Sequence, residues 1–313
     1  MEVLPTAREL AGYALTAQHP LTRTWVDDHI RLELLTEQRE IDVRLAHDVD
    51  LAAARAHRFA PGSPPGALLN RWADVGDGLR AMMSMRYEGE DSRRPFVDAT
   101  PLSRPLIEQD ARSLVRVAGR IYGPLKPRYL RLWSARPHGT FPRSGPDKRF
   151  MAAPLHALRG GNGRHISSEL ALTRARSLRN YPQAQLAYVA ARDRHPDHAR
   201  QAALHSIEDL ADTQAAGGLF DITVNDTWAG YVAATTDSDD TLGLPAYVVQ
   251  ELILTAEFRG RGYGPHLTTL LAHVLPNQER VLVGTIHAAN HGALHAAESA
   301  GRADVGGWIQ FSL

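Results

Sequence analysis

The stretch Arg259-Gly260-Arg261-Gly262-Tyr263-Gly264 decides the fold of the second half of this chain. An apolar run at residues 247–254 precedes it and predicts a strand, and apolar residues at helical spacing follow at 267–274 and predict a helix. Glycines allow bare backbone N–H groups to close around an anion, and the start of a helix adds partial positive charge. The stretch therefore predicts a phosphate-binding loop between a strand and a helix.

The spacing of these glycines excludes two common kinds of nucleotide loop. Gly-x-Gly-x-x-Gly would indicate a dinucleotide-binding loop, and Gly-x-x-x-x-Gly-Lys-Ser/Thr would indicate a nucleotide-hydrolysing loop. Residues 259–264 follow neither pattern. A different ligand with phosphate groups is expected, and a tight connection without any ligand is the alternative.

Strands and helices are expected to continue on both sides of the loop. Asn225-Asp226-Thr227 is a polar turn pattern between apolar runs, which predicts a β-hairpin. Pro276 ends the helix that follows the loop. The other expected elements of this half are strands at 185–190, 281–287 and 308–313, a helix at 197–214, and a turn at Gly306-Gly307.

The first half predicts a similar mixture of elements. We expect a helix at 51–59 that Asp50 caps, a second helix at 111–122, and strands at 40–45, 79–87, 95–99 and 129–135. Residues 136–164 are rich in proline, glycine and basic residues and lack apolar periodicity, which predicts a linker. We place the domain boundary there, with domains at 1–150 and 151–313.

Composition excludes several classes of function. The 313 residues contain 35 basic and 35 acidic side chains, so the attraction that nucleic acids or anionic membranes require is missing. The sequence has no cysteine, which excludes thiolate catalysis and disulfides. No apolar run approaches the roughly 20 residues that span a bilayer, and no signal peptide is evident. We expect a cytoplasmic protein without nucleic-acid or membrane partners.

The second half resembles the GNAT superfamily of acetyl-CoA-dependent N-acyltransferases. That family has the loop pattern Arg/Gln-x-x-Gly-x-Gly/Ala, which Arg259, Gly262 and Gly264 match. Asn290 and Ala293 are similar to a later Asn-x-x-Ala segment of the family. The resemblance covers residues 185–313 and implies an α/β (α+β) fold, in which helices flank a mixed, mostly antiparallel central sheet.

The resemblance also implies where acetyl-CoA would bind as co-substrate, without a metal ion. Backbone N–H groups of the loop would hold the pyrophosphate, and the pantetheine arm would lie along the preceding strand. Asn290 would bond to the arm or to the loop. The cofactor-binding residues implied are Leu252, Ile253, Leu254, Arg259, Gly260, Arg261, Gly262, Tyr263, Gly264 and Asn290.

Glu251 is the catalytic candidate, because many family members carry a base on this strand and an amine must lose a proton to react. Strand alternation leaves open whether its carboxylate points to solvent instead. The family usually supplies a tyrosine as general acid where this chain has Ala297. Solvent, His287, His291 or Ser299 could replace it. A non-catalytic coenzyme A sensor or interaction module is the alternative function.

The first half lacks the loop pattern and is expected to be either a degenerate second GNAT copy or an accessory α+β domain. After Gly301 the chain is short for a GNAT domain, so the N-terminal domain or a second subunit should cover the exposed sheet edge. A homodimer is therefore possible. The acceptor is expected to be a small-molecule or peptide amine, whose identity the sequence does not reveal.

Overall fold

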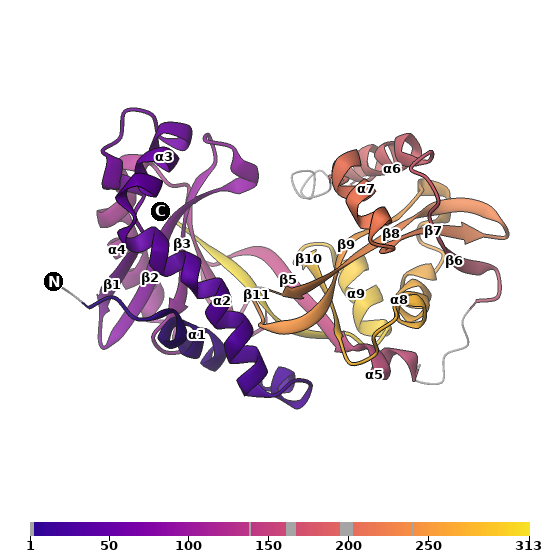
Figure 1. Cartoon of the computed structure of the whole chain (residues 1–313), viewed down its shortest axis with the longest axis horizontal. Helices are drawn as coiled ribbons and strands as arrows, with labels where there is room; N and C mark the ends of the chain where they lie inside the picture. Colours follow the sequence, from indigo (N-terminus) through magenta and orange to yellow (C-terminus); the bar gives the residue numbers. More distant parts are fainter. Residues whose placement is uncertain (1–2, 138, 161–166, 195–202, 240) are drawn as a thin grey trace. The chain divides into compact units, whose positions relative to one another are not determined.

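The structure, a computed structural model, describes residues 3–137, 139–160, 167–194, 203–239 and 241–313. The chain divides into two compact units (Figure 1). Unit 1 consists of Met1–Asp147, Asp240–Gly243 and Gly306–Leu313, and unit 2 consists of Lys148–Asp239 and Leu244–Val305. In the parts that the structure describes, no helix is both long and apolar enough to cross a membrane.

Unit 1 is a mixed sheet with helices on both faces. Its strands follow the order β1-β2-β3-β4, next to which lies the last part of β11. β3 and β4 run parallel and the other neighbours run antiparallel. The elements are α1 (Ala7–Thr16), α2 (Asp28–His47), α3 (Val49–Phe59), β1 (Arg71–Gly76), β2 (Leu79–Tyr87), β3 (Pro95–Leu102), α4 (Asp110–Tyr122), β4 (Tyr129–Ser134) and β11 (Ala303–Ser312).

The two faces of this sheet follow from the alternation of side chains along its strands. Trp72 and Met82 pack with Leu10 of α1, whereas Ala73 and Met83 pack into the larger core with Leu114 of α4. Each strand therefore has apolar residues on both faces, because helices cover both of them.

The end of the chain completes this sheet. Gly307 to Ser312 of β11 pair with Ser134 to Tyr129 of β4, and Ile309 and Phe311 join the core of unit 1. The N-terminal half thus covers the C-terminal strand, as the sequence predicts. The turn expected at Gly306-Gly307 is wrong, because both glycines lie within β11. Gly306 has φ +130°, and a Cβ there would lie 2.6 Å from a ring carbon of Trp133.

Unit 2 contains the glycine-rich loop. Its strands follow the order β6-β7-β8-β9-β10-β5. Helices α6 and α7 lie on one face, and α8 lies on the other with α5 and α9 (Figure 1). The elements are β5 (Gly145–Pro154), α5 (Leu155–Arg159), β6 (Leu170–Arg174), α6 (Tyr181–Arg194), α7 (Ile207–Ala215), β7 (Leu219–Val224), β8 (Thr227–Asp239), β9 (Leu244–Leu254), α8 (Tyr263–Val274), β10 (Val281–His287) and α9 (His291–Ser299).

The strand expected at 185–190 is wrong, because these residues belong to α6. The small residues Ala184 and Ala187 face the sheet, while Leu186 is 67% exposed and Val189 is 41% exposed. The apolar run therefore reflects exposed apolar residues on a helix. The helix expected at 197–214 begins at Ile207, and residues 195–202 lie outside the described part of the chain.

The strand expected at 40–45 is also wrong, because α2 contains it. Apolar and polar residues alternate here as in a strand, at Ile41, Val43 and Leu45. In the helix, however, Asp42 is buried and forms an ion pair with Arg39 (2.7 Å), while Ile41 is exposed. The helix after it, α3, is capped by Asp48, whose side chain accepts from Leu51 N–H (2.8 Å), and not by Asp50.

The linker expected at 136–164 contains a central strand and a short helix. β5 pairs antiparallel with β10 from Pro154 opposite Val281 to Lys148 opposite His287. Residues 150 and 151, between which the sequence analysis places the domain boundary, both lie in β5. The last residues of β5 are almost entirely buried and apolar, a pattern typical of a strand covered on both faces.

Candidate functional site

The connection from β9 to α8 opens the backbone at two glycines. Gly260 has φ +73° and Gly262, the N-cap of α8, has φ +81°. Residues with a side chain rarely adopt this left-handed conformation. Nothing in the described part of the chain lies within 4 Å of an ideal Cβ at either glycine. The loop therefore presents bare backbone to open space.

The N-terminus of α8 carries no neutralising group of its own. Its first turn contains no acidic residue, and no side chain in the described part of the chain caps its N–H groups. The first N–H groups of a helix have no partner within the helix and carry partial positive charge. Together with the glycines, this helix end fits an anion such as a phosphate.

The Arg259 side chain connects the loop to β9 and α6. Arg259 donates from Nε to Leu254 C=O and from Nη2 to Ala187 C=O, both at 2.7 Å. Burial lowers the pKa of this guanidinium, and nearby Arg194 adds to the effect. A Cβ on Gly264 would lie 2.8 Å from Cβ of Ala296, so this glycine allows α8 and α9 to approach closely.

Next to the loop, two parallel strands part. β9 and β10 pair from Ala246 opposite Val281 to Val249 opposite Gly284. Beyond that rung β10 continues along β5, while β9 continues along β8 to Leu254. The second half of β9 consequently has one edge that no neighbouring strand of the described chain occupies.

The register of β8 and β9 determines which backbone groups face that edge. Thr255 N–H donates to Ala229 C=O (2.8 Å), in the same register as the pair Ile253 and Tyr231. In antiparallel pairs, every second residue directs its N–H and C=O to the partner, and the others direct them away. The backbone of Ile253 therefore points to β8, and Leu252 and Leu254 point their N–H groups to the open edge.

Glu251 lies at an irregularity of β9. Glu251 pairs with Ala233 and Val249 pairs with Ala234, so Gln250 between them forms a bulge. The Glu251 side chain is 1% exposed. The solvent-facing orientation that the sequence left open is therefore wrong.

Two residues that the sequence analysis missed hold the Glu251 carboxylate. The hydroxyl of Tyr188, from α6, donates to Oε2. His205 donates its backbone N–H to Oε1 (2.8 Å), and its Nδ1 lies 2.7 Å from the same oxygen. The buried carboxylate is thus paired with an imidazole whose side chain is 41% exposed.

The contacts with Glu251 shift the pKa values of both His205 and Tyr188. The hydrogen bond to Glu251 raises the pKa of His205, with smaller contributions from the charges of Glu251 and Asp209, while burial and Lys148 lower it. Burial raises the pKa of Tyr188, and the charge of Glu251 raises it further. The pairing with Glu251 thus favours the protonated, charged form of the His205 imidazole.

Residues 181–301 match the model of the acetyltransferase (GNAT) family. This segment is a GNAT domain. GNAT proteins use acetyl-CoA as acyl donor, so the match agrees with the open anion site and the parted strands. A search of curated proteins finds no match for the chain.

Solved structures of GNAT proteins are similar to most of the chain at low sequence identity. A GNAT acetyltransferase from Colwellia psychrerythraea is 11% identical with TM-score 0.46, over 84% of this chain and 95% of that one. A GCN5-related N-acetyltransferase from Sphaerobacter thermophilus is 13% identical with TM-score 0.45, over 87% and 93%. A tandem GNAT protein from the clavulanic acid biosynthesis pathway is 17% identical with TM-score 0.41, over 86% and 94%.

Two further positions of the GNAT domain lie on α9. Asn290 is the N-cap of this helix, and its Oδ1 accepts from Ala293 N–H (3.2 Å). Its expected bond to acetyl-CoA stays a prediction. Ala297, where the family usually has a tyrosine, is 1% exposed and brings no acidic hydrogen to the site.

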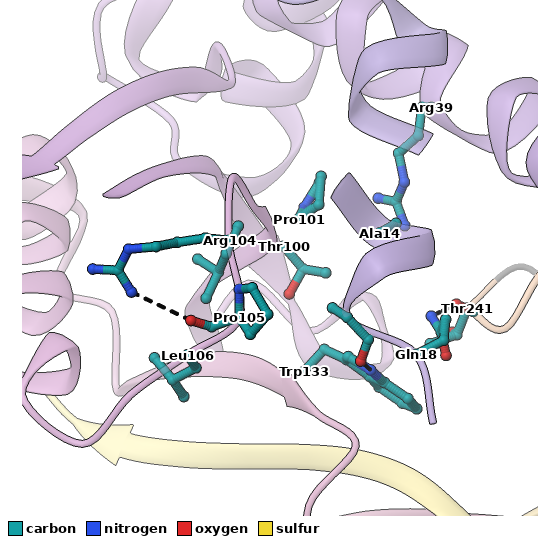
Figure 2. Close-up of a pocket in the computed structure, with 12 residues that line it drawn as sticks. Ala14, Gln18, Arg39, Thr100, Pro101, Arg104, Pro105, Leu106, Trp133 and Thr241 are labelled. Carbon is teal, nitrogen blue, oxygen red and sulfur yellow. Dashed lines mark hydrogen bonds between the residues drawn. The ribbon is translucent and has the colours of Figure 1, made fainter. Parts of the chain in front are cut away.

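Unit 1 contains a small pocket, and one of its lining residues, Thr241, comes from the matched segment 181–301 (Figure 2). Gln18, Arg39, Thr100 and Arg104 are among the residues that line it. Gln18 Oε1, Arg39 Nε and Thr100 Oγ1 are buried and find no hydrogen-bond partner within the described ranges. The pocket residues belong to unit 1, whereas the loop between β9 and α8 belongs to unit 2.

Proposed function

We propose that the GNAT domain transfers an acetyl group from acetyl-CoA to a primary amine by direct transfer. The observation that supports this most strongly is the uncapped N-terminus of α8, with two left-handed glycines, beside the point where β9 and β10 part. An anion site and an open strand edge are what the phosphates and the amide-bearing arm of coenzyme A require.

In this proposal the backbone holds the donor. N–H groups from Arg259 to Gly264 bind the pyrophosphate, and Gly260 and Gly262 leave room for it. The arm lies along Leu252, Ile253 and Leu254, where the outward N–H groups of Leu252 and Leu254 bind its carbonyl groups and polarise the thioester. Asn290 steadies the arm from the start of α9.

Glu251 acts in the removal of the proton from the amine. A protonated amine has no free electron pair, so a base must take its proton before or during attack. The Glu251 side chain is buried beside Tyr188 of α6 and is linked to His205, which reaches solvent. The pair provides a path along which the proton leaves the site. A small-molecule or peptide amine is the acceptor class proposed, acting in the cytoplasm.

Calorimetric titration of acetyl-CoA tests the donor site. Gly262→Glu places a carboxylate against the pyrophosphate, and we expect it to abolish the binding seen with the wild-type protein. The matched control is Gly62→Glu in unit 1, where φ is +86° and nothing among the described residues lies within 4 Å of the Cβ position. It imposes the same backbone strain away from the loop, so binding should be unchanged.

The outcomes separate the proposed functions. Absence of binding to the wild-type protein would refute both acyl transfer and coenzyme A sensing. Binding without turnover of any amine would favour a non-catalytic coenzyme A-binding protein, a function that Ala297 in place of tyrosine supports. Turnover that Glu251→Gln reduces about a hundredfold or more, the usual range for a lost general base, would support the enzyme.

A further inference from the structure

Arg302 carries a buried positive charge. The residue is 7% exposed, and its Nε finds no hydrogen-bond partner among the residues that the structure describes. Within the described ranges, no carboxylate forms an ion pair with its guanidinium, and burial lowers its pKa to about 10. Leaving a charged group buried and unpaired is costly, so native proteins rarely keep one without a use.

The guanidinium lies where β9 and β10 part. An ideal Cβ on Gly284 would lie 2.7 Å from Arg302 Nη1 and 3.5 Å from Cβ of Val249. Gly284 and Val249 form the last paired rung between the two strands. The absence of a side chain at Gly284 makes room for the guanidinium at this rung.

Ala297 is joined to Arg302 by a backbone hydrogen bond. The backbone N–H of Arg302 donates to Ala297 C=O (3.0 Å), so the position that lacks the family's tyrosine is connected to the arginine. Val249 packs with the core on the α8 face of the sheet. Glu251, by contrast, contacts α6 through Tyr188. The base and the guanidinium therefore lie on opposite faces of β9, on either side of its bulge.

The direction of the donor follows from the proposed function, on which this inference rests. The pyrophosphate binds at the loop beyond Leu254, so the arm runs back along β9 and its sulfur reaches the rung at Val249 and Gly284. We propose that Arg302 stabilises the thiolate of coenzyme A as it leaves the acetyl group, in place of the missing tyrosine.

The step is balanced without a further reactant. The amine nitrogen bonds to the acetyl carbonyl carbon, and the bond from that carbon to sulfur breaks. The electron pair of the broken bond stays on sulfur, next to the guanidinium, and the amine proton passes to Glu251 and His205. A cation beside a thiol stabilises its thiolate form and lowers its pKa.

The acidity of bound coenzyme A tests this role without any turnover. The chain contains no cysteine, so the thiol of coenzyme A is the only one in the complex. Thiolate absorbance is titrated against pH, with the desulfo-coenzyme A complex as the blank that removes tyrosine absorbance. We expect the wild-type protein to lower the thiol pKa by about 1–3 pH units relative to free coenzyme A, and Arg302→Gln to lose most of this effect.

Desulfo-coenzyme A also supplies the control for binding. Its affinity should be the same for the wild-type protein and Arg302→Gln, because it lacks the sulfur. An unchanged thiol pKa in Arg302→Gln would overturn the proposal, and so would an equal loss of affinity for both ligands, which would place the guanidinium on another part of the arm. Wild-type protein that binds neither ligand would refute the proposed function itself.

The stability of the free protein gives a second test. Removing an unpaired buried charge relieves its desolvation cost, so Arg302→Met should raise the urea midpoint of unfolding. The matched control is Arg159→Met, because Arg159 donates to Ala272 C=O (2.7 Å) and to Leu275 C=O at the end of α8. This control should lower the midpoint. An equal fall in Arg302→Met would show a structural role for Arg302 and overturn the proposal.

Discussion

The two units contain the same local arrangement of strand, helix and strand, but the N-termini of the two helices differ in charge. In each, a strand leads through a loop into a helix and then into a parallel neighbour of the strand: β3, α4 and β4 in unit 1, and β9, α8 and β10 in unit 2. The helix ends differ. α8 begins at a glycine with open space before it, whereas α4 begins with Asp110.

Asp110 places a carboxylate of the protein itself in the first turn of α4. It is buried, accepts from Ile107 N–H (2.9 Å), and binds Arg104 through two hydrogen bonds of 2.7 and 2.9 Å. The hydrogen bond to Asp110 raises the pKa of Arg104. The same strand, helix and strand can therefore carry a buried ion pair of the protein at the start of the helix, as in unit 1, or leave the helix start open, as in unit 2.

Asp110→Ala should lower the stability of the protein more than the substitutions that follow. It leaves Arg104 and Ile107 N–H without their acceptor, and we expect a loss of about 2–3 kcal/mol in the free energy of unfolding. Urea denaturation measures it. The matched control is Asp91→Ala, which breaks a solvated pair with Arg93 and should change stability far less.

The same variant sharpens the comparison of the two loops. Calorimetry of Asp110→Ala should still show a single acetyl-CoA site, because the loop before α4 lacks the glycines of 260–264. A second site would show that the carboxylate alone distinguishes the units, and this would contradict our explanation.

Gly264→Ala should cost somewhat less, about 1–2 kcal/mol of overpacking. The new methyl group would lie 2.8 Å from Cβ of Ala296 and push α8 away from α9. Adding Ala296→Gly should restore part of the loss, although glycine itself weakens α9. A double-mutant cycle on thermal unfolding measures this coupling. If the two effects simply add, the glycine has no packing role between the helices.

The smallest effect expected is a pH dependence caused by His205. Its pKa in the folded protein is raised above the ordinary value of 6.5, so its contribution is complete below the unfolded-state pKa and is lost as pH rises through the folded-state pKa. Because the imidazole is half-exposed, we expect about 0.5 kcal/mol or less. NMR titration should give a lower pKa for His205 in Glu251→Gln, and an unchanged value would count against the pairing.

The sequence predicted the elements whose signal is local. The helix after the loop, the strand at 281–287 and the hairpin around Asn225 and Asp226 agree with the structure, and both turn residues have positive φ. The strands of unit 1 at 79–87 and 129–135 agree within a residue at each end. In these segments periodicity and turn chemistry both favour the observed element.

The predictions failed where tertiary contacts override the local pattern. Apolar and polar residues alternate at 40–45, which predicts a strand. The segment is helical, and its polar Asp42 is buried through ion pairs with Arg39 and Arg86, which the local pattern does not reveal. Among the site residues, Tyr188 and His205 lie 63 and 46 residues from Glu251 and belong to no motif. Had 181–194 been taken as a helix, Tyr188 would have been placed one turn after Ala184 on the face toward β9.

The position of β11 in the sheet of unit 1 has a consequence for biosynthesis. Residues 306–313 belong to unit 1, yet the ribosome adds them only after all of unit 2. Until then β4 has an unpaired edge, and the core that takes up Ile309 and Phe311 is incomplete. Contacts between residues so distant in sequence form slowly. Unit 1 must therefore wait for the synthesis of residues 306–313 to finish folding, even though most of it is synthesised before unit 2.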